Sequence, residues 1–165
     1  MPHESHIAQR IIESPIGQIA IRATPRGLTA VRIGTTESAP IPPFPTAAAI
    51  LEEAAAQLHA YFAGNRRTFD LPIDWQTLNL TPFQRRVLEA VQRVPWGAVT
   101  RYATLAESIG RPGGAQAVGQ ALARNPLLIV IPCHRVVGPR NELRGYAGGI
   151  EAKIWLLQHE GVLLG

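Results

Sequence analysis

The chain has 165 residues, 46% of them hydrophobic, and at this length a compact domain buries roughly 70% of the surface that its unfolded chain exposes. No run of about eighteen apolar residues occurs, and the first ten residues lack a basic stretch followed by an apolar one, so neither a membrane span nor a signal peptide is expected. Residues 81–165 carry ten Arg and Lys against five Asp and Glu, and this excess favours a polyanionic partner such as nucleic acid.

The first part of the chain predicts a small antiparallel sheet. Short β segments over residues 7–13, 18–23 and 28–33 are separated by two turns that contain Pro and Gly. Residues 39–45 then hold four prolines, so this segment is predicted to be a connector rather than a helix.

A helix is predicted after the connector. Thr46 is placed to cap it, Ala, Leu and Glu dominate as far as about Ala63, and Gly64 supplies a stop signal. Residues 69–73 predict a last strand, which completes an N-terminal α/β domain over residues 1–76.

The character of the sequence changes near residues 74–80. Residues 77–165 are predicted to form a second, mainly helical domain, which makes the fold class α+β. Thr81, Pro82 and Gln84 combine an N-cap, a Pro at the first helical position and the second half of a capping box. The helix that they begin has one apolar face, made by Phe83, Val87, Leu88 and Val91.

Two short helices separated by a Gly-containing turn follow. Thr100 is placed to cap a helix over residues 101–108, residues 110–114 form a tight turn, and residues 115–124 form the second helix. This order predicts a helix-turn-helix.

The second of these helices has two distinct faces. Val118 and Leu122 point inward, whereas Gln116, Gln120 and Arg124 form a polar stripe on the opposite side. Small residues flank the stripe and would let the helix backbone approach a DNA groove closely. A plain solvated face on an Ala-rich helix is the alternative interpretation.

The single cysteine, Cys133, permits no internal disulfide, which suits a reducing compartment. It follows a buried apolar strand predicted over residues 127–131, is preceded by Pro132 and is followed by His134 and Arg135. A neighbouring His or Arg would stabilise the thiolate, the form of cysteine that acts as a nucleophile. The alternative is an inert structural thiol beside a surface histidine.

A last helix is predicted over residues 150–160, with an inner face of Ile150, Ile154 and Leu157. Glu160 falls in its final turn, where the helix dipole disfavours an anion. Such a carboxylate could orient His134, which would then take the proton of the Cys133 thiol. An exposed glutamate of no consequence is the alternative.

Four sequence blocks together resemble one family, the O6-alkylguanine-DNA alkyltransferases. The blocks are Asn-Pro at 125–126, Pro-Cys-His-Arg-Val at 132–136, Gly-Tyr-Ala-Gly-Gly at 145–149 and His-Glu-Gly at 159–161. Their order and spacing are family-like, and the resemblance covers residues 81–161, about half of the chain. The proposed helix-turn-helix falls where the family has one.

The resemblance implies a catalytic set. Cys133 would form its thiolate through His134, and Glu160 would polarise the histidine through an intervening water. Asn125 would brace the turn that carries the cysteine. The reaction would be a single, irreversible transfer of an alkyl group from O6-alkylguanine, and secondarily O4-alkylthymine, to Cys133. Neither a cofactor nor a metal is needed for it.

The resemblance also implies how DNA is bound. The helix-turn-helix would enter the minor groove of double-stranded DNA, and the damaged base would be rotated out of the stack. The base would lie near Tyr102 and Tyr146, with main-chain groups of Cys133, Val136 and Ala147 reading its polar edge. The expected DNA-binding residues are Tyr102, Ala103, Ala115, Gln116 and Gln120.

Further expectations concern the rest of the chain. The N-terminal domain would be a ribonuclease-H-like structural domain. The protein would be cytoplasmic, would associate with the nucleoid through DNA, and would need neither a membrane nor an obligatory protein partner.

One position departs from the family pattern. The family usually has an Arg where this chain has Gln116, and that Arg fills the space left by the extruded base. A neutral amide can fill space and form hydrogen bonds, but it lacks the charge that pairs with phosphates.

Three classes of function stay open at this point. They are a repair transferase, a lesion-binding or regulatory helix-turn-helix protein without catalysis, and a Cys-His-Glu hydrolase. The presence of Cys133 favours the first over the second, because lesion-binding relatives lack the reactive cysteine. A hydrolase would turn over repeatedly and would have little use for the basic helix.

Overall fold

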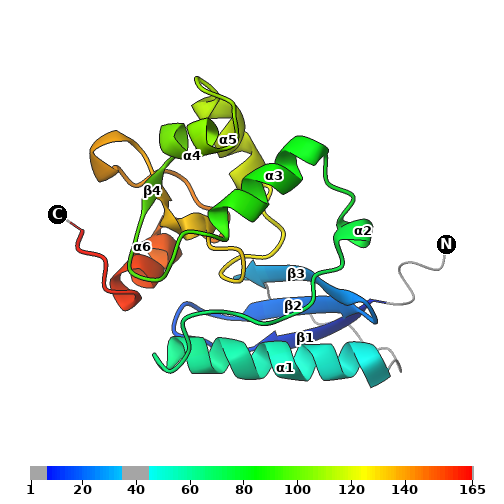
Figure 1. Ribbon diagram of the computed structural model, residues 1–165. Helices are drawn as coiled ribbons and strands as arrows, with labels where there is room; N and C mark the ends of the chain where they lie inside the picture. Colours follow the sequence, from blue (N-terminus) through cyan, green and yellow to red (C-terminus); the bar gives the residue numbers. More distant parts are fainter. Residues whose placement is uncertain (1–6, 35–44, 165) are drawn as a thin grey trace. The chain divides into compact units, whose positions relative to one another are not determined.

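The computed structural model describes residues 7–34 and 45–164 and separates into two compact units, residues 1–79 and 80–165. The predicted α+β fold class is confirmed, because the first unit holds a three-stranded antiparallel sheet and the second is mainly helical (Figure 1). Within the described residues, no helix is long and apolar enough to cross a membrane.

The sheet of the first unit has the strand order β1-β2-β3. Its strands are β1 (Ala8–Ile12), β2 (Ile19–Thr24) and β3 (Gly27–Ile33), all close to the segments predicted from the sequence. Ile19 pairs with both Ile12 and Ile33, so the register brings apolar residues of the three strands into one row.

Helix α1 (Pro45–Phe62) packs against this sheet, as the ribbon shows (Figure 1). Its buried residues recur at helical spacing, which gives one apolar stripe: Ala47, Leu51, Ala54, Leu58 and Tyr61. The prediction that Thr46 caps the helix is wrong, because Pro45 already begins it; a proline without an N–H is favoured at a first helical position. Residues 39–44 of the predicted connector lie outside the described residues.

No strand forms over residues 69–73, contrary to the prediction. Only Ile73 forms an isolated parallel bridge with Leu28, supported by a hydrogen bond from Leu28 N to Pro72 O at 2.8 Å. The approach is close at Gly27, whose φ is +156° and where a Cβ would lie 2.7 Å from Pro72 O. Glycine is therefore required at the start of β3.

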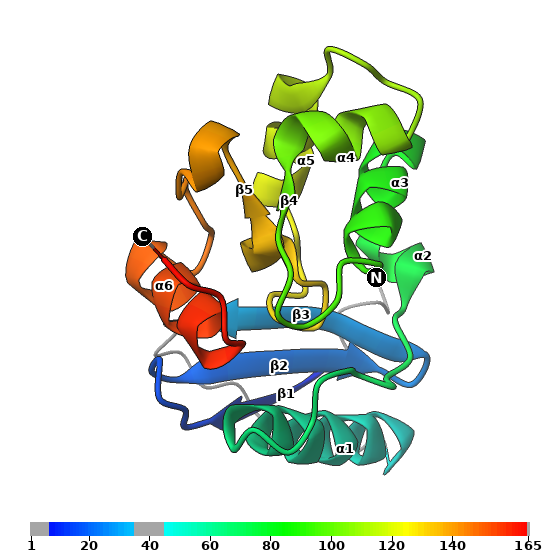
Figure 2. The ribbon, with the colours of Figure 1, turned by 60° about the vertical axis from the view of Figure 1, so that its left-hand side comes forward.

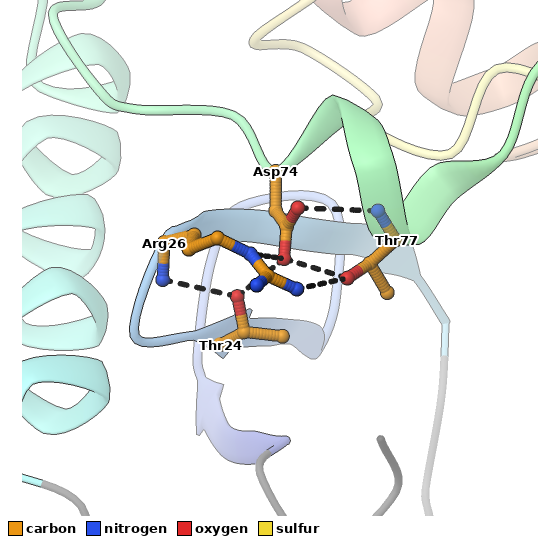
Figure 3. A network of polar contacts seen from close by, with 4 residues as sticks. All are labelled: Thr24, Arg26, Asp74 and Thr77. Carbon is orange, nitrogen blue, oxygen red and sulfur yellow. Dashed lines mark hydrogen bonds and ion pairs between the residues drawn. The ribbon is translucent and has the colours of Figure 1, made fainter.

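A polar network around Asp74 ties this region to the β2–β3 turn (Figure 3). Asp74 is 3% exposed and caps helix α2 (Trp75–Leu78) through its Oδ1, which accepts from Thr77 N. Its Oδ2 accepts from the hydroxyls of Thr24 at 2.6 Å and Thr77 at 2.7 Å, and pairs with Arg26 Nε at 3.4 Å. Burial raises the pKa of this carboxyl, but the hydrogen bonds from Thr24 and Thr77 outweigh it and hold the pKa below its ordinary value.

In the second unit, α3 (Pro82–Val91) begins with the predicted capping box. Thr81 Oγ1 accepts from Gln84 N at 3.1 Å, and the Gln84 side chain accepts from Thr81 N at 3.0 Å. Val87, Leu88, Ala90 and Val91 form its buried face, and the helix packs against α4 and α5. Phe83 is only partly buried, so the apolar face is narrower than predicted.

Helices α4 (Tyr102–Ser108) and α5 (Ala115–Ala123) pack on each other across the turn at residues 109–114 (Figure 2). Contrary to the prediction, Thr100 does not cap α4; it lies in strand β4 (Thr100–Arg101). This strand pairs in parallel with β5 (Val136–Val137). The pairing extends the backbone before α4, which is why the helix begins two residues after Thr100.

Two 3₁₀ turns, η2 (Cys133–Arg135) and η3 (Pro139–Asn141), flank β5, and helix α6 (Ile150–His159) ends the unit. Of the predicted inner face of α6 only Leu157 is buried, since Ile150 is 43% exposed and Ile154 is only partly buried. The buried side chains are Ala152, Lys153, Leu156 and Leu157. The helix is thus turned relative to the prediction, which brings a lysine inside.

Candidate active site

The side-chain amide of Asn125 holds the segment that leads to Cys133. Asn125 lies two residues after the end of α5 and is 6% exposed. Its Nδ2 donates to Ile131 O at 2.8 Å and to Cys133 Sγ at 3.2 Å, while its Oδ1 accepts from Leu127 N at 2.9 Å. One side chain therefore fixes both ends of the segment and contacts the sulfur.

Residues 127–131 are buried, as expected, but they do not form the predicted strand. Val130 N donates to Leu128 O and Ile131 N donates to Leu127 O, so the chain folds back on itself in a tight turn. Ile129 has a φ of +72°, a conformation that costs a β-branched residue on the order of 1–3 kcal/mol. The bonds of Asn125 on both sides hold this turn in place.

Cys133 begins the turn η2 and is 6% exposed. Burial raises the pKa of its thiol to about 11, although the hydrogen bond from Asn125 and the charge of Lys153 act in the opposite direction. Neither His134 nor Arg135 is among the groups that lower the pKa of this thiol. At neutral pH the buried thiol carries its proton, and a base is needed to remove it.

His134 is fully buried, contrary to the alternative of a surface histidine. Its Nε2 lies 2.8 Å from Glu160 Oε2. Burial lowers the pKa of the imidazole, while Glu160 raises it, and the net direction is downward. A neutral ring must place its proton on Nε2 to donate to the carboxylate, which leaves Nδ1 as the basic nitrogen. Nδ1 has no hydrogen-bond partner within the described part of the chain.

Glu160 is also buried, with 2% of its surface exposed, which excludes the alternative of an inconsequential exposed residue. Arg135 Nε donates to its Oε1 at 2.7 Å and Arg135 Nη2 donates to its Oε2 at 3.0 Å. Burial raises the pKa of the carboxyl, but the bonds from His134 and Arg135 prevail and hold it at about 2. The sequence analysis did not foresee this role of Arg135, which binds Glu160 rather than the thiol.

Lys153 is a second residue that the sequence analysis missed. It is 1% exposed, and its Nζ donates to Val136 O at 2.8 Å and to Arg144 O at 3.3 Å. Burial lowers its pKa to about 8. A helix turned so that Leu156 and Leu157 face inward also turns Lys153 inward, and this was the signal available in the sequence.

The thiol lies at a cleft of about 1160 Å³ within the second unit. The cleft is lined by the start of α4, by α5 and by the loop that follows β5: Arg101, Tyr102, Ala103, Ala115, Gln116, Gly119, Gln120, Leu122, Ala123, Cys133, Pro139, Arg144, Gly145, Tyr146 and Ala147. The rings of Tyr146 and His134 meet edge to face, with centroids 6.3 Å apart. The arrangement offers a nucleophile at the wall of a cleft, with a base and its carboxylate buried behind it.

The structure brings most of the predicted site residues to this cleft. Seven expected substrate- or DNA-contacting residues line it: Tyr102, Ala103, Ala115, Gln116, Gln120, Tyr146 and Ala147. Val136 does not line it and is fully buried beside the thiol. Arg124 is exposed, as expected for the polar stripe, but it also lies outside the lining.

Comparison with known proteins shows what this arrangement is similar to. The family model "6-O-methylguanine DNA methyltransferase, DNA binding domain" matches residues 82–162, and the model of the ribonuclease-like domain of the same methyltransferase matches residues 7–75. A methylated-DNA–protein-cysteine methyltransferase of Mycobacterium tuberculosis is 41% identical over 158 residues, which cover 93% of this chain and 92% of the relative. The chain belongs to the methylated-DNA–protein-cysteine methyltransferase family.

Solved structures of the family agree. The crystal structure of the Mycobacterium tuberculosis O6-methylguanine methyltransferase superposes with a TM-score of 0.80 at 40% identity, covering 93% of this chain and 92% of that one. A crystal structure of the same organism's protein in complex with DNA also gives a TM-score of 0.80, at 41% identity. A family member from Shigella flexneri is 50% identical, but over 109 residues that span 62% of its own length.

Proposed function

We propose that this member of the family repairs alkylated DNA by transferring the alkyl group of O6-alkylguanine to Sγ of Cys133. The observation that carries the proposal is the pair of contacts behind the cleft: Asn125 donates to Sγ at 3.2 Å, and His134 next along the chain is held by Glu160 at 2.8 Å. A protonated thiol, a neutral imidazole and an ionised carboxylate are the states that a proton relay requires.

The relay begins with the thiol proton. Nδ1 of His134 is the basic nitrogen, and one water between it and Sγ would carry the proton from sulfur to imidazole. The positive charge that develops on the ring is stabilised by Glu160, which stays ionised because its pKa is about 2. Arg135 neutralises the carboxylate while the ring is neutral, so that the buried charge is paired at each stage.

The transfer then follows from the chemistry of sulfur. The Sγ–carbon bond forms as the carbon–O6 bond breaks, and guanine leaves with the electron pair of that bond. A proton delivered back through the same relay neutralises the departing base. The product is a thioether, which has no electrophilic carbonyl for water to attack, so each molecule reacts once and irreversibly.

The base is recognised within the cleft. Tyr102 and Tyr146 provide aromatic surfaces on which a purine ring can lie, and main-chain groups of Cys133, Val136 and Ala147 read its polar edge. Val136 is buried and outside the cleft lining, and its carbonyl oxygen accepts from Lys153, so in this proposal its second lone pair becomes available only as the base displaces the residues that cover it. O4-alkylthymine presents an alkylated oxygen in a similar place and is proposed as a secondary substrate.

DNA is bound by α4 and α5 acting as a helix-turn-helix in the minor groove. The alkyl carbon is inaccessible inside a duplex, so the base must be extruded, which costs a few kcal/mol. Small residues on both helices, Ala103 and Ala115, permit close approach of the backbone, while Gln120 adds polar contacts. Gln116 enters the space that the base leaves, without the charge that the family usually has there.

The two parts of the chain have separate tasks in this proposal. Residues 77–165 bind DNA and transfer the alkyl group, whereas residues 1–76 form a structural domain. The reaction needs no metal, cofactor or obligatory protein partner, and it suits a cytoplasmic protein that associates with the nucleoid through DNA.

Mass spectrometry of the intact protein tests the proposal. After incubation with a duplex that contains one O6-methylguanine, the protein should gain one methyl group, located on the peptide that contains Cys133, and the gain should stop at one equivalent. Cys133→Ser should bind the duplex almost as well and gain nothing. Repeated turnover would favour a hydrolase, and comparable loss of binding and transfer in a folded Ser variant would contradict the role of Cys133.

A further inference from the structure

The cleft has a charge pattern that the proposed reaction does not use. Among the lining residues only Arg101 and Arg144 are charged, and none is acidic. Transfer of a methyl group needs neither cation, and Gln116, which also lines the cleft, is neutral. The cleft therefore presents positive charge to whatever occupies it.

Arg144 is held by its backbone at the wall of the cleft. Its carbonyl oxygen accepts from the buried Nζ of Lys153 at 3.3 Å, which fixes the start of the loop to α6. Its guanidinium lies against Gly138, where a Cβ would be only 2.7 Å from Arg144 Nε. Glycine at position 138 thus makes room for this side chain, and a larger residue would displace it.

The guanidinium is available to a ligand. Its Nη2 lies 3.3 Å from Glu142 Oε1, and both side chains of this ion pair are more than half exposed. Exposed pairs of this kind are weak and exchange with water. The other guanidinium N–H groups have no acceptor among the described residues, so an incoming oxyanion would find several donors in a planar fork.

The charge of Arg144 reaches the reacting end of the cleft. Burial is the largest cause that raises the pKa of Tyr102; ionisation of Cys133 raises it further, and Arg144 lowers it. Arg144, Tyr102 and Cys133 also line one cleft, so a substrate that reaches the sulfur shares this space with the guanidinium.

We propose that Arg144 is a specificity residue that binds an oxyanion of the substrate beside the transferred carbon. This inference rests on the proposed alkyl transfer. The oxyanion has two sources with the same chemistry: a carboxylate at the end of the alkyl group, as in O6-carboxymethylguanine, or a phosphate of the strand that carries the lesion. The transfer step itself is unchanged, because Sγ still displaces guanine from the carbon attached to O6.

The test compares Arg144→Gln with two matched controls. Arg93→Gln removes an exposed positive charge outside the cleft and outside the helix-turn-helix, and Glu142→Gln removes the partner of Arg144 while keeping the guanidinium. The transfer rate to Cys133 is measured for duplexes with O6-methylguanine or O6-carboxymethylguanine, and for free O6-benzylguanine, which needs no DNA contact.

If the carboxylate is the ligand, Arg144→Gln slows carboxymethyl transfer about tenfold or more relative to methyl transfer, the effect of one lost charge-assisted hydrogen bond. Glu142→Gln then leaves that ratio unchanged or raises it, and Arg93→Gln does not alter it. If a phosphate is the ligand, Arg144→Gln slows both duplex reactions equally, spares the free base and lowers the salt slope by about one counterion.

Two results would overturn the inference. Equal slowing of all three substrates would mean that Arg144 acts through the fold of the loop, and unchanged rates for all three would mean that it is a solvated surface residue. Both outcomes differ from failure of the proposed function, in which the wild-type protein would gain no methyl group from the O6-methylguanine duplex.

Discussion

Nζ of Lys153 donates a hydrogen bond to the carbonyl oxygen of Val136 across 2.8 Å, inside a region from which solvent is almost excluded. The same Nζ reaches Arg144 O, so one buried cation joins α6 to two segments that flank the thiol. Its charge also favours ionisation of Cys133. Lys153 is therefore both a brace for the cleft and an electrostatic support for the thiolate.

Replacement of Lys153 by Met should raise the pKa of the Cys133 thiol above its present value of about 11. Each unit of increase lowers the thiolate population at neutral pH about tenfold. Alkylation by O6-benzylguanine across a pH series measures this, with Lys153→Arg as the variant that keeps the charge. An unchanged pH profile in a folded Met variant would show that Lys153 only braces the loop.

Replacement of Glu160 by Gln should slow transfer, because the amide cannot stabilise a protonated His134. The deficit should shrink as the pH rises toward about 11, where hydroxide ionises the thiol without help from the relay. Stopped-flow transfer rates measured between about pH 6 and about pH 10 test this trend. A loss that is independent of pH would mean that Glu160 acts by positioning alone.

The Glu160 variant needs a control for stability. Removal of the carboxylate strands the buried Arg135, which typically costs about 3–5 kcal/mol. Because the pKa of Glu160 is held at about 2, below its ordinary 4.5, the stabilisation it contributes is present above pH 4.5 and is lost as the pH falls toward 2. The double variant Glu160→Gln with Arg135→Gln removes both charges and should recover stability without recovering the transfer rate.

Gln116 should matter for duplex DNA and not for a free base. If it fills the gap left by the extruded base, Gln116→Ala should slow repair of the duplex far more than reaction with O6-benzylguanine. Gln116→Arg should bind duplex more tightly, with a salt slope steeper by about one counterion. Equal effects of Ala on the two substrates would locate its action in the fold or at the thiol.

Asp74 should stabilise the first unit against unfolding, to an extent that depends on pH. Its pKa is held below the ordinary 3.8, so its contribution is present above that pH and fades as the pH falls further. Asp74→Asn keeps an oxygen that can accept from Thr77 N, but it turns a donor toward the hydroxyls of Thr24 and Thr77 and should cost about 1–3 kcal/mol at neutral pH. Urea unfolding of the full chain measures it, with the exposed Asp70→Asn as control; equal midpoints for the two variants would refute a role for the network.

The sequence predicted those elements whose signals are local. The capping box at Thr81 and Gln84 is a contact between residues three apart, and the three strands of the first unit are bounded by turns that propensity identifies. The two helices over residues 102–123 and the turn between them are predicted from the glycines in that turn. Each of these depends on few residues, close together in the chain.

The errors arise where particular side-chain contacts, or contacts between residues distant in the sequence, decide the structure. The strand predicted at residues 127–131 is a turn because Asn125 binds both of its ends, and apolar composition alone cannot distinguish the two. Thr100 pairs with β5, 36 positions further along the chain, rather than capping a helix. Adjacency in sequence suggested that Arg135 would stabilise the Cys133 thiolate, whereas in the fold its guanidinium binds Glu160.

The parallel pairing of β4 with β5 has a geometric consequence for repair. Thr100 and Arg101 lead directly into the helix that forms one wall of the cleft, and Val136 and Val137 come directly after the turn that bears the sulfur. In the repair reaction proposed above, backbone hydrogen bonds rather than side chains would therefore set the reach from the DNA-facing rim to the nucleophile. Exchanges of side chains on this frame would change which lesions enter, while the distance that an extruded nucleotide travels would stay constant.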